Sequence, residues 1–263
     1  MSTLRDAAVI ARRNIIRIRR VPDVMVFVLI QPLMFVVLFA YVFGGSINIP
    51  GGSYREFLMA GIFAQTVVFG ATFTGSGLAE DLQKGLINRF RSLPMARSAV
   101  VAGRTASDVI YNGLSILIMS ITGLAVGWRI RGSILDAIAA YAILLFFSYS
   151  FSWVMACIGL SVPTPEVVNN ASFMVLFPLT FIANTFVPSD NLPGVLQTIA
   201  EWNPISTLTH SVRDLFGNIP QGTPEPTAWP LQNSVLYTLI WAVMLIVVFA
   251  PLATRLYQRS GKH

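Results

Sequence analysis

Residues 80–108 read EDLQKGLINRFRSLPMARSAVVAGRTASD and form a long charged segment between two long apolar segments. The segment starts with the acidic pair Glu80 and Asp81, and its basic residues are Lys84, Arg89, Arg91, Arg97 and Arg104. Apolar side chains recur at the spacing of one helix face, at Leu82, Leu86, Phe90 and Leu93. Pro94 should end this helix, because proline disfavours helical geometry in the residue before it. The sequence therefore predicts a short amphipathic helix at a membrane surface, with Asp81 near its start, where the helix dipole favours a carboxylate.

Two roles are compatible with this amphipathic helix. A basic loop can lie on the anionic lipid headgroups of the cytoplasmic membrane face. The apolar stripe of the helix can instead form a docking site for a partner protein. The residues of the segment, taken alone, leave both roles open.

The composition excludes a soluble protein. Of the 263 residues, 54% are hydrophobic and 11% are charged, whereas soluble domains carry about 25% charged residues. The net charge is +6, but the charges gather in loops, so anionic lipid explains them better than nucleic acid does. The single cysteine, Cys157, excludes an internal disulfide and lies in an apolar run, as a small core residue does. We therefore expect one integral membrane domain over residues 1–263.

Six apolar runs predict six membrane-spanning helices, since a bilayer requires about twenty residues per helix. The predicted spans are 24–43, 57–79, 109–127, 135–162, 168–187 and 234–253. Before them, the arginine-rich residues 2–21 predict an amphipathic helix in the membrane interface. The apolar run that follows is too long for a secretory signal, and no small-residue cleavage site follows it.

The distribution of basic residues predicts the orientation. Most of the 18 lysines and arginines fall in residues 2–21, the cytoplasmic loop 80–104 and the C-terminal segment, so both termini should lie in the cytoplasm. The loops on the opposite side hold Arg55, Arg129, Arg131 and Arg213.

Residues 188–217 do not form a further span. Two amphipathic stretches of about a dozen residues are separated by Asn203 and Pro204, and each is too short to cross a bilayer. Gly217 should act as the C-terminal cap of the second stretch. This pattern predicts two short helices on the extracellular side, as a re-entrant hairpin or as two surface helices.

Polar and small residues interrupt three of the predicted spans. Gln31 and Pro32 place an amide and a kink in the first span, where the amide needs a partner helix. Residues 70–77 are rich in small side chains, which favours close packing of helices over a substrate path. The fifth span is the most polar and contains Asn169, Asn170, Pro178 and Asn184.

Motifs for catalysis or for binding a nucleotide or metal are absent from the sequence. It contains no P-loop and no Cys/His cluster with metal-ligand spacing. Ser206, His210 and Asp214 share one helix face, which we interpret as the polar side of an amphipathic helix. The spans contain few ionisable residues, with Asp108 and Glu166 expected at cytoplasmic helix ends. An ion-coupled transporter needs a carboxylate near the middle of the membrane, so the energy for any transport should come from elsewhere.

The segment 80–108 resembles the first cytoplasmic loop of ABC-2 type transporter permeases, especially those of the daunorubicin-resistance type. The matching positions are Asp81, Gly85, Arg89, Pro94, Arg97, Gly103, Arg104 and Asp108. Weaker matches extend the resemblance to about residues 5–257, at 177–181, 186–188, 192–193, 202–204, Arg213 and Gly217. The resemblance implies an all-α ABC-2, or type V, exporter fold with six spans, an interfacial N-terminal helix and a re-entrant hairpin. It also implies that the loop contains a coupling helix that contacts a separate ATP-binding subunit, through Asp81, Gly85, Arg89, Pro94 and Arg97.

We therefore interpret the chain as the permease subunit of an ATP-driven exporter in a bacterial plasma membrane. The resemblance implies two permease chains, expected to be identical, and two ATP-binding subunits. ATP and Mg²⁺ would bind in those subunits, so this chain would hold no cofactor and catalyse nothing by itself. Membrane lipids would be further partners, and nucleic acid would not.

The substrate would be a hydrophobic or amphipathic drug-like compound or a lipid. Candidate path residues are Gln31, Phe35, Phe39, Phe63, Phe69, Phe73, Phe177 and Phe181, with core packing as the alternative for each aromatic ring. The residues Asn203, Pro204 and Arg213 mark the extracellular hairpin. Two other classes remain open from the sequence, namely a secondary transporter or channel without an ATPase, and a membrane assembly factor.

Overall fold

The computed structural model describes residues 11, 30, 33–43, 51–87, 97–189 and 192–259. Over these ranges, the regular elements are helices and no strand occurs. Five helical stretches are long and apolar enough to cross a membrane: Tyr54–Gln83, Ala99–Val126, Ile134–Ser161, Pro165–Ile182 and Ser234–Arg259. The prediction of an all-α, multi-pass membrane protein is therefore confirmed.

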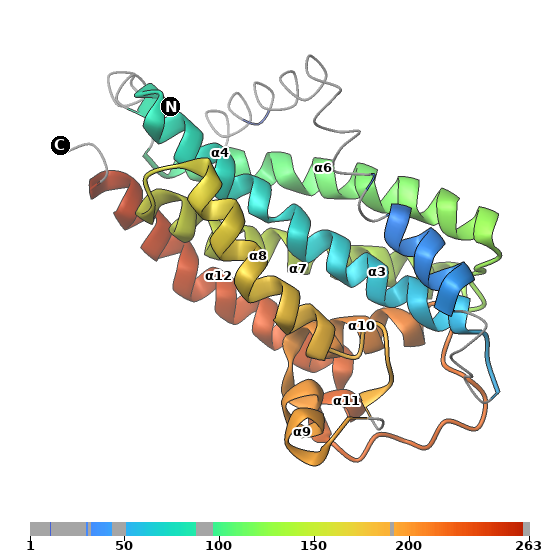
Figure 1. Ribbon diagram of the computed structural model, residues 1–263. Helices are drawn as coiled ribbons and strands as arrows, with labels where there is room; N and C mark the ends of the chain where they lie inside the picture. The colour runs from blue at the N-terminus through green and yellow to red at the C-terminus, as the bar shows by residue number, and fades with distance from the viewer. Residues whose placement is uncertain are drawn as a thin grey trace.

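The long helices run side by side as a bundle (Figure 1). They are α3 (Tyr54–Gly70), α4 (Thr72–Gln83), α6 (Arg97–Val126), α7 (Ile134–Ser161), α8 (Pro165–Ile182) and α12 (Ser234–Arg259). The second predicted span corresponds to α3 and α4, which meet at Ala71. The fifth predicted span is shorter than expected, because α8 ends at Ile182 and Asn184 lies in the connection that follows.

The predicted first span is described only in part. Residues 33–42 form a short apolar helix that ends in the π-helical turn η1 (Phe39–Phe43). Gln31 and Pro32 lie outside the described residues, as does all of the predicted interfacial helix 2–21 except Ala11.

Helix α7 is central to the bundle and packs against α3, α4, α6, α8, α10 and α12. It starts with a capping box, in which the Ser133 hydroxyl accepts from the Asp136 amide and the Asp136 carboxylate accepts from the Ser133 amide, both at 3.2 Å. Leu144 and Phe147 are fully buried in the main apolar core. The polar cap at its start and the long apolar run that follows together favour a helix at these positions.

The small residues at 70–77 let α4 approach its neighbours closely. A side chain added at Gly159 of α7 would overlap the carbonyl oxygen of Gly75, and one added at Gly75 would lie 2.7 Å from the carbonyl oxygen of Met155. The two backbones are therefore in direct contact. This geometry supports the packing interpretation of the small residues over the substrate-path interpretation.

Two short helices occupy the predicted hairpin region, α9 (Gly194–Trp202) and α10 (Pro204–Leu215). The Asn203 side chain accepts from the Ile205 amide at 2.9 Å, so it caps α10, and Pro204 takes the first helical position. Gly217 has φ +68°, with Gly217 N–H bonded to Asp214 O and Asn218 N–H bonded to Arg213 O, both at 2.8 Å. These two bonds define a Schellman motif, so the predicted break and the predicted glycine cap are confirmed.

The two helices of the hairpin differ in burial. Most of α10 is buried, including Ile205, Leu208 and Val212, which join the main core. In contrast, α9 exposes Val195 and Ile199. Thus α10 is a core element, and α9 lies outside it with α11 (Trp229–Gln232) at one end of the bundle (Figure 1).

The charged segment differs from its prediction. Helix α4 ends at Gln83, and Gly85 forms a turn with φ +65°, so a single helix from Leu82 to Leu93 is wrong. The apolar spacing fits one helix face, but the left-handed backbone at Gly85 breaks the helix there. Asp81 therefore lies near the end of α4 and not near a helix start.

Helix α6 starts earlier than the predicted third span. Because α6 begins at Arg97, Asp108 lies eleven residues along it, about 16 Å from its start at 1.5 Å per residue. Its side chain is 5% exposed. The expectation that Asp108 sits at a helix end is therefore wrong.

Candidate functional site

Five of the seven predicted path phenylalanines lie on one continuous row of rings. Along α8, Phe173, Phe177 and Phe181 stack in sequence, with ring centroids 5.0 and 4.2 Å apart. Phe181 continues to Phe186 at 4.8 Å, and Phe186 to Phe39 of the first apolar helix at 4.7 Å. We call this set the aromatic row; its members are Phe35, Phe39, Phe69, Phe173, Phe177, Phe181 and Phe186.

The other two predicted path phenylalanines lie elsewhere. Phe63 is fully buried and packs against Trp128 and Phe216, with ring centroids 5.4 and 5.8 Å away. Phe73 packs against Tyr111 of α6 at 4.9 Å. Core packing accounts for both rings.

Sequence reasoning missed two members of the aromatic row. Phe173 is four residues before Phe177, so the i,i+4 rule for helix neighbours could have found it. Phe186 lies beyond the end of α8 and reaches the row through the fold of the connection. Only the tertiary structure reveals this second contact.

The row is exposed in part. Phe173 and Phe181 of α8 are 51% and 38% exposed, beside the exposed Met174 and Val175, whereas Phe186 is 3% exposed and joins the main core, against which Phe35, Phe39 and Phe69 pack. Helix α8 also exposes the amides Asn169 and Asn170. Exposed amides are unfavourable against lipid tails, so this mixed face suits contact with protein or with a solvated path better than contact with lipid alone.

The predicted coupling residues are only partly described. Asp81 is 3% exposed near the end of α4, and Gly85 forms the turn that follows. Beside them, Lys84 and Glu80 form an ion pair of 2.6 Å. Arg89 and Pro94 lie outside the described residues, and of Arg97 the structure describes the backbone at the start of α6. The structure therefore does not show how the five residues lie relative to one another.

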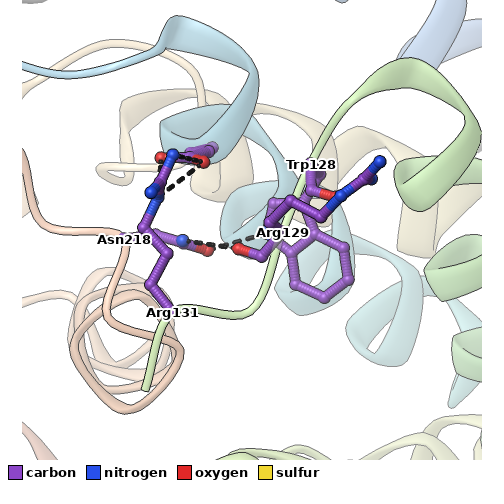
Figure 2. A network of polar contacts seen from close by, with 5 residues as sticks. Trp128, Arg129, Arg131 and Asn218 are labelled. Carbon is purple, nitrogen blue, oxygen red and sulfur yellow. Dashed lines mark hydrogen bonds and ion pairs between the residues drawn. The ribbon is translucent and has the colours of Figure 1, made fainter.

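A polar network closes the end of the bundle where α3 and α7 begin (Figure 2). The Trp128 indole donates to the Asn218 side chain at 2.7 Å, and that amide donates to the Arg129 carbonyl at 2.9 Å. Arg131 pairs with Glu56 at 2.9 Å. The network joins the start of α3, the connection from α6 to α7, and the chain after α10.

Arg213 is the buried basic residue of this end. Its side chain donates to the carbonyls of Phe57 and Asn184, each at 3.1 Å, and its guanidinium carbon lies 3.6 Å from the centroid of the Phe57 ring. Burial lowers the pKa of Arg213 to about 9, so the group stays charged at neutral pH. The four basic residues predicted to share one side, Arg55, Arg129, Arg131 and Arg213, all contact groups at this end.

Comparison with known proteins supplies the family context of this arrangement. Residues 6–216 match the family described as ABC-2 type transporter. The chain is 33% identical over 251 residues to the daunorubicin resistance ABC transporter permease protein DrrB1 of Streptomyces coeruleorubidus, covering 95% of this chain and 85% of that protein.

Two more distant relatives cover a similar share of the chain. The probable doxorubicin resistance ABC transporter permease protein DrrC of Mycobacterium tuberculosis is 21% identical over 239 residues, 89% of this chain and 82% of that protein. The putative transport permease ycf38 of Porphyra purpurea is 24% identical over 239 residues, 89% of this chain and 78% of that protein.

Proposed function

The chain belongs to the ABC-2 type transporter family, and from this premise we propose that it is the permease of an exporter for hydrophobic or amphipathic compounds. Membership makes it a multi-pass membrane subunit of an ABC transporter. The proposed cargo is a drug-like molecule or a lipid, moved out of the cytoplasm or the inner leaflet. The names of the relatives that refer to daunorubicin and doxorubicin resistance favour this class of cargo.

The aromatic row is the observation that carries the proposal. Its rings offer a long apolar surface with few fixed hydrogen-bonding groups, which suits cargoes that differ in polar substituents. Ring stacking gives each contact about 0.5–1.5 kcal/mol beyond its buried area. A planar amphiphile can therefore exchange contacts from ring to ring in small steps.

A second copy of the chain would complete the path. In one chain, Phe173 and Phe181 leave part of the row exposed on α8, with Met174 and Asn170 exposed beside it. Two copies with these faces opposed would enclose the row and shield the amides from lipid. We propose a homodimer for this reason.

Energy would come from two ATP-binding subunits docked at the loop between α4 and α6. The sequence has no P-loop, so ATP and Mg²⁺ would bind in those subunits. The exposed turn at Lys84 and Gly85 ends the span that enters this loop, and a docked subunit would meet it first. The excess of basic residues on this side supports the proposal that the loop and both termini lie in the cytoplasm of a bacterial cell.

The test uses doxorubicin as the probe, in cells that express the chain together with a P-loop ATPase that co-purifies with it. Phe177→Ala and Phe181→Ala should each lower the export rate about two- to tenfold, the effect of losing one ring contact. The matched control is Ile121→Ala, since Ile121 is an exposed apolar residue of α6 away from the row. If the two row variants export doxorubicin as fast as the Ile121→Ala control, at equal abundance in the membrane, the aromatic row is not the path.

A further inference from the structure

The first halves of α4 and α6 are joined by a polar seam, formed by Phe73, Thr74 and Gly77 on α4 and by Arg104 and Asp108 on α6. The Thr74 hydroxyl donates to the Asp108 carboxylate. The Arg104 guanidinium donates to the Phe73 carbonyl at 2.8 Å. Thr74 is fully buried and Asp108 nearly so, which shields the bond between them from competing water, whereas the bond from Arg104 to Phe73 is partly buried.

Gly77 makes room for this arrangement. A side chain added there would overlap the Arg104 guanidinium, so the absence of a Cβ lets the arginine lie flat across α4. A side chain added at Gly70 would likewise overlap the side chain of Asn112, which lies one turn further along α6 than Asp108. The Asn112 side chain in turn donates to Ser148 of α7 at 2.8 Å. Gly70 at the end of α3 and Gly77 on α4 are thus each matched to a polar residue on α6.

The seam fixes the register of the two helices. Arg104, Asp108 and Tyr111 are spaced i, i+4, i+7 and share one face of α6, and Tyr111 adds a ring contact to Phe73. Apolar packing alone tolerates small slides between helices. A buried hydrogen bond does not, because its loss leaves a buried polar group without a partner.

The seam adds a lateral connection to the second span. The span Tyr54–Gln83 has a single-residue turn at Ala71, where the Ala71 amide still bonds to Val67 O at 3.2 Å and the Thr74 amide bonds to Ala71 O at 3.1 Å. A displacement of α4 can therefore travel along the span into α3. Through the seam it can pass directly to α6, which is continuous from Arg97 to Val126.

We propose that Arg104 and Asp108 are positioning residues that make α4 and α6 move as one rigid unit when the loop between them is displaced. The inference rests on the proposed ATP-driven function. In this inference, the two residues transmit the movement of the loop. They do not bind the ATPase, and they do not contact the cargo. The distinguishing quantity is therefore the amount of cargo exported per ATP hydrolysed.

The test compares mild variants with matched controls in the purified complex with its ATPase, reconstituted in liposomes with doxorubicin as the cargo. Thr74→Val removes the hydroxyl and keeps the shape, while Gly77→Ala displaces Arg104 without changing its charge. The controls are Thr122→Val, whose hydroxyl donates within α6, and Gly113→Ala, whose added Cβ would meet its nearest neighbour at 3.9 Å.

Both seam variants should still bind the ATPase and keep its basal rate of ATP hydrolysis. The amount of cargo exported per ATP should fall about tenfold in both. Thr74→Ser, which keeps the hydroxyl, should export as much cargo per ATP as the native chain. A merely structural role would instead lower the melting temperature and leave export per ATP unchanged; that result, or coupled export by both seam variants, overturns the inference. If the wild-type complex itself shows no ATP-dependent export, the proposed function fails and the inference fails with it.

Discussion

Replacement of Arg213 by lysine tests whether the buried guanidinium holds α10 in place. In the native protein, one nitrogen of the fork donates to both Phe57 O and Asn184 O at 3.1 Å, and Nε donates to Phe57 O at 3.3 Å. Arg213→Lys keeps the positive charge and most of the length of the side chain. It removes the planar fork that reaches two carbonyls and stacks on a ring at once.

The expected loss follows from these contacts. Loss of one hydrogen bond from a charged donor costs about 1.5–3 kcal/mol. Displacement of the cation from the Phe57 ring, 3.6 Å below it, costs about 1–2 kcal/mol in a desolvated site. The total of about 3 kcal/mol corresponds to a melting temperature lower by roughly 6–12 °C for a chain of this size.

Thermal unfolding of the detergent-purified protein, followed by tryptophan fluorescence, measures this effect. The matched control is Arg129→Lys, because Arg129 is exposed and donates to carbonyls of its own turn. The control should melt within about 2 °C of the native protein, as surface substitutions do. If Arg213→Lys also melts within that margin, the carbonyl contacts of Arg213 do not stabilise this end of the bundle.

Three further predictions concern pH, the turn and the topology. Burial and the charge of Arg213 lower the pKa of His210 to about 4, from an ordinary value of 6.5. Between these values the unfolded chain binds more protons than the folded one, so stability should fall as the pH drops, by on the order of 2 kcal/mol at pH 5. His210→Gln should flatten this part of the pH profile of unfolding, and an unchanged slope would contradict the assignment. Gly85 has a left-handed backbone, and among the described residues no atom lies within 4 Å of an added Cβ. Gly85→Asn should therefore preserve export while Gly85→Leu lowers it, because asparagine tolerates this conformation; equal export by the two would show that the turn geometry does not matter. Cysteines at Ser53 and Thr223, in a cysteine-free background, should react with an impermeant thiol reagent on intact cells, and a cysteine at Ser98 only after permeabilisation. Labelling at Ser98 in intact cells would invert the proposed orientation.

Features set by local chemistry could be predicted from the sequence. The break at Asn203 and Pro204 and the cap at Gly217 depend on the fixed φ of proline, the capping side chain of asparagine and the left-handed freedom of glycine. Each acts within one turn of helix. The positions of the long apolar helices follow equally from length and composition.

Features set by distant contacts could not. The spacing of Leu82 and Leu86 fits one helix face, and only the backbone at Gly85 shows that the helix has already ended. The burial of Arg213 depends on carbonyls 156 and 29 residues away along the chain. The division of the phenylalanines into a core group and the aromatic row likewise depends on which helices are neighbours, which periodicity does not encode.

The burial of α10 also constrains the order in which the protein can be assembled. This helix carries Thr207, Thr209, Ser211 and Arg213 into the interior, so it is too polar and too short to enter a bilayer by itself. Thr207 meets Thr238 of α12 at 3.1 Å, and α12 is synthesised after α10. Because α10 also packs on α3 and α7, its docking can start earlier but can be completed only after the last span has inserted, and a ribosome-bound chain that stops before residue 234 should leave this helix more accessible to protease than in the full protein.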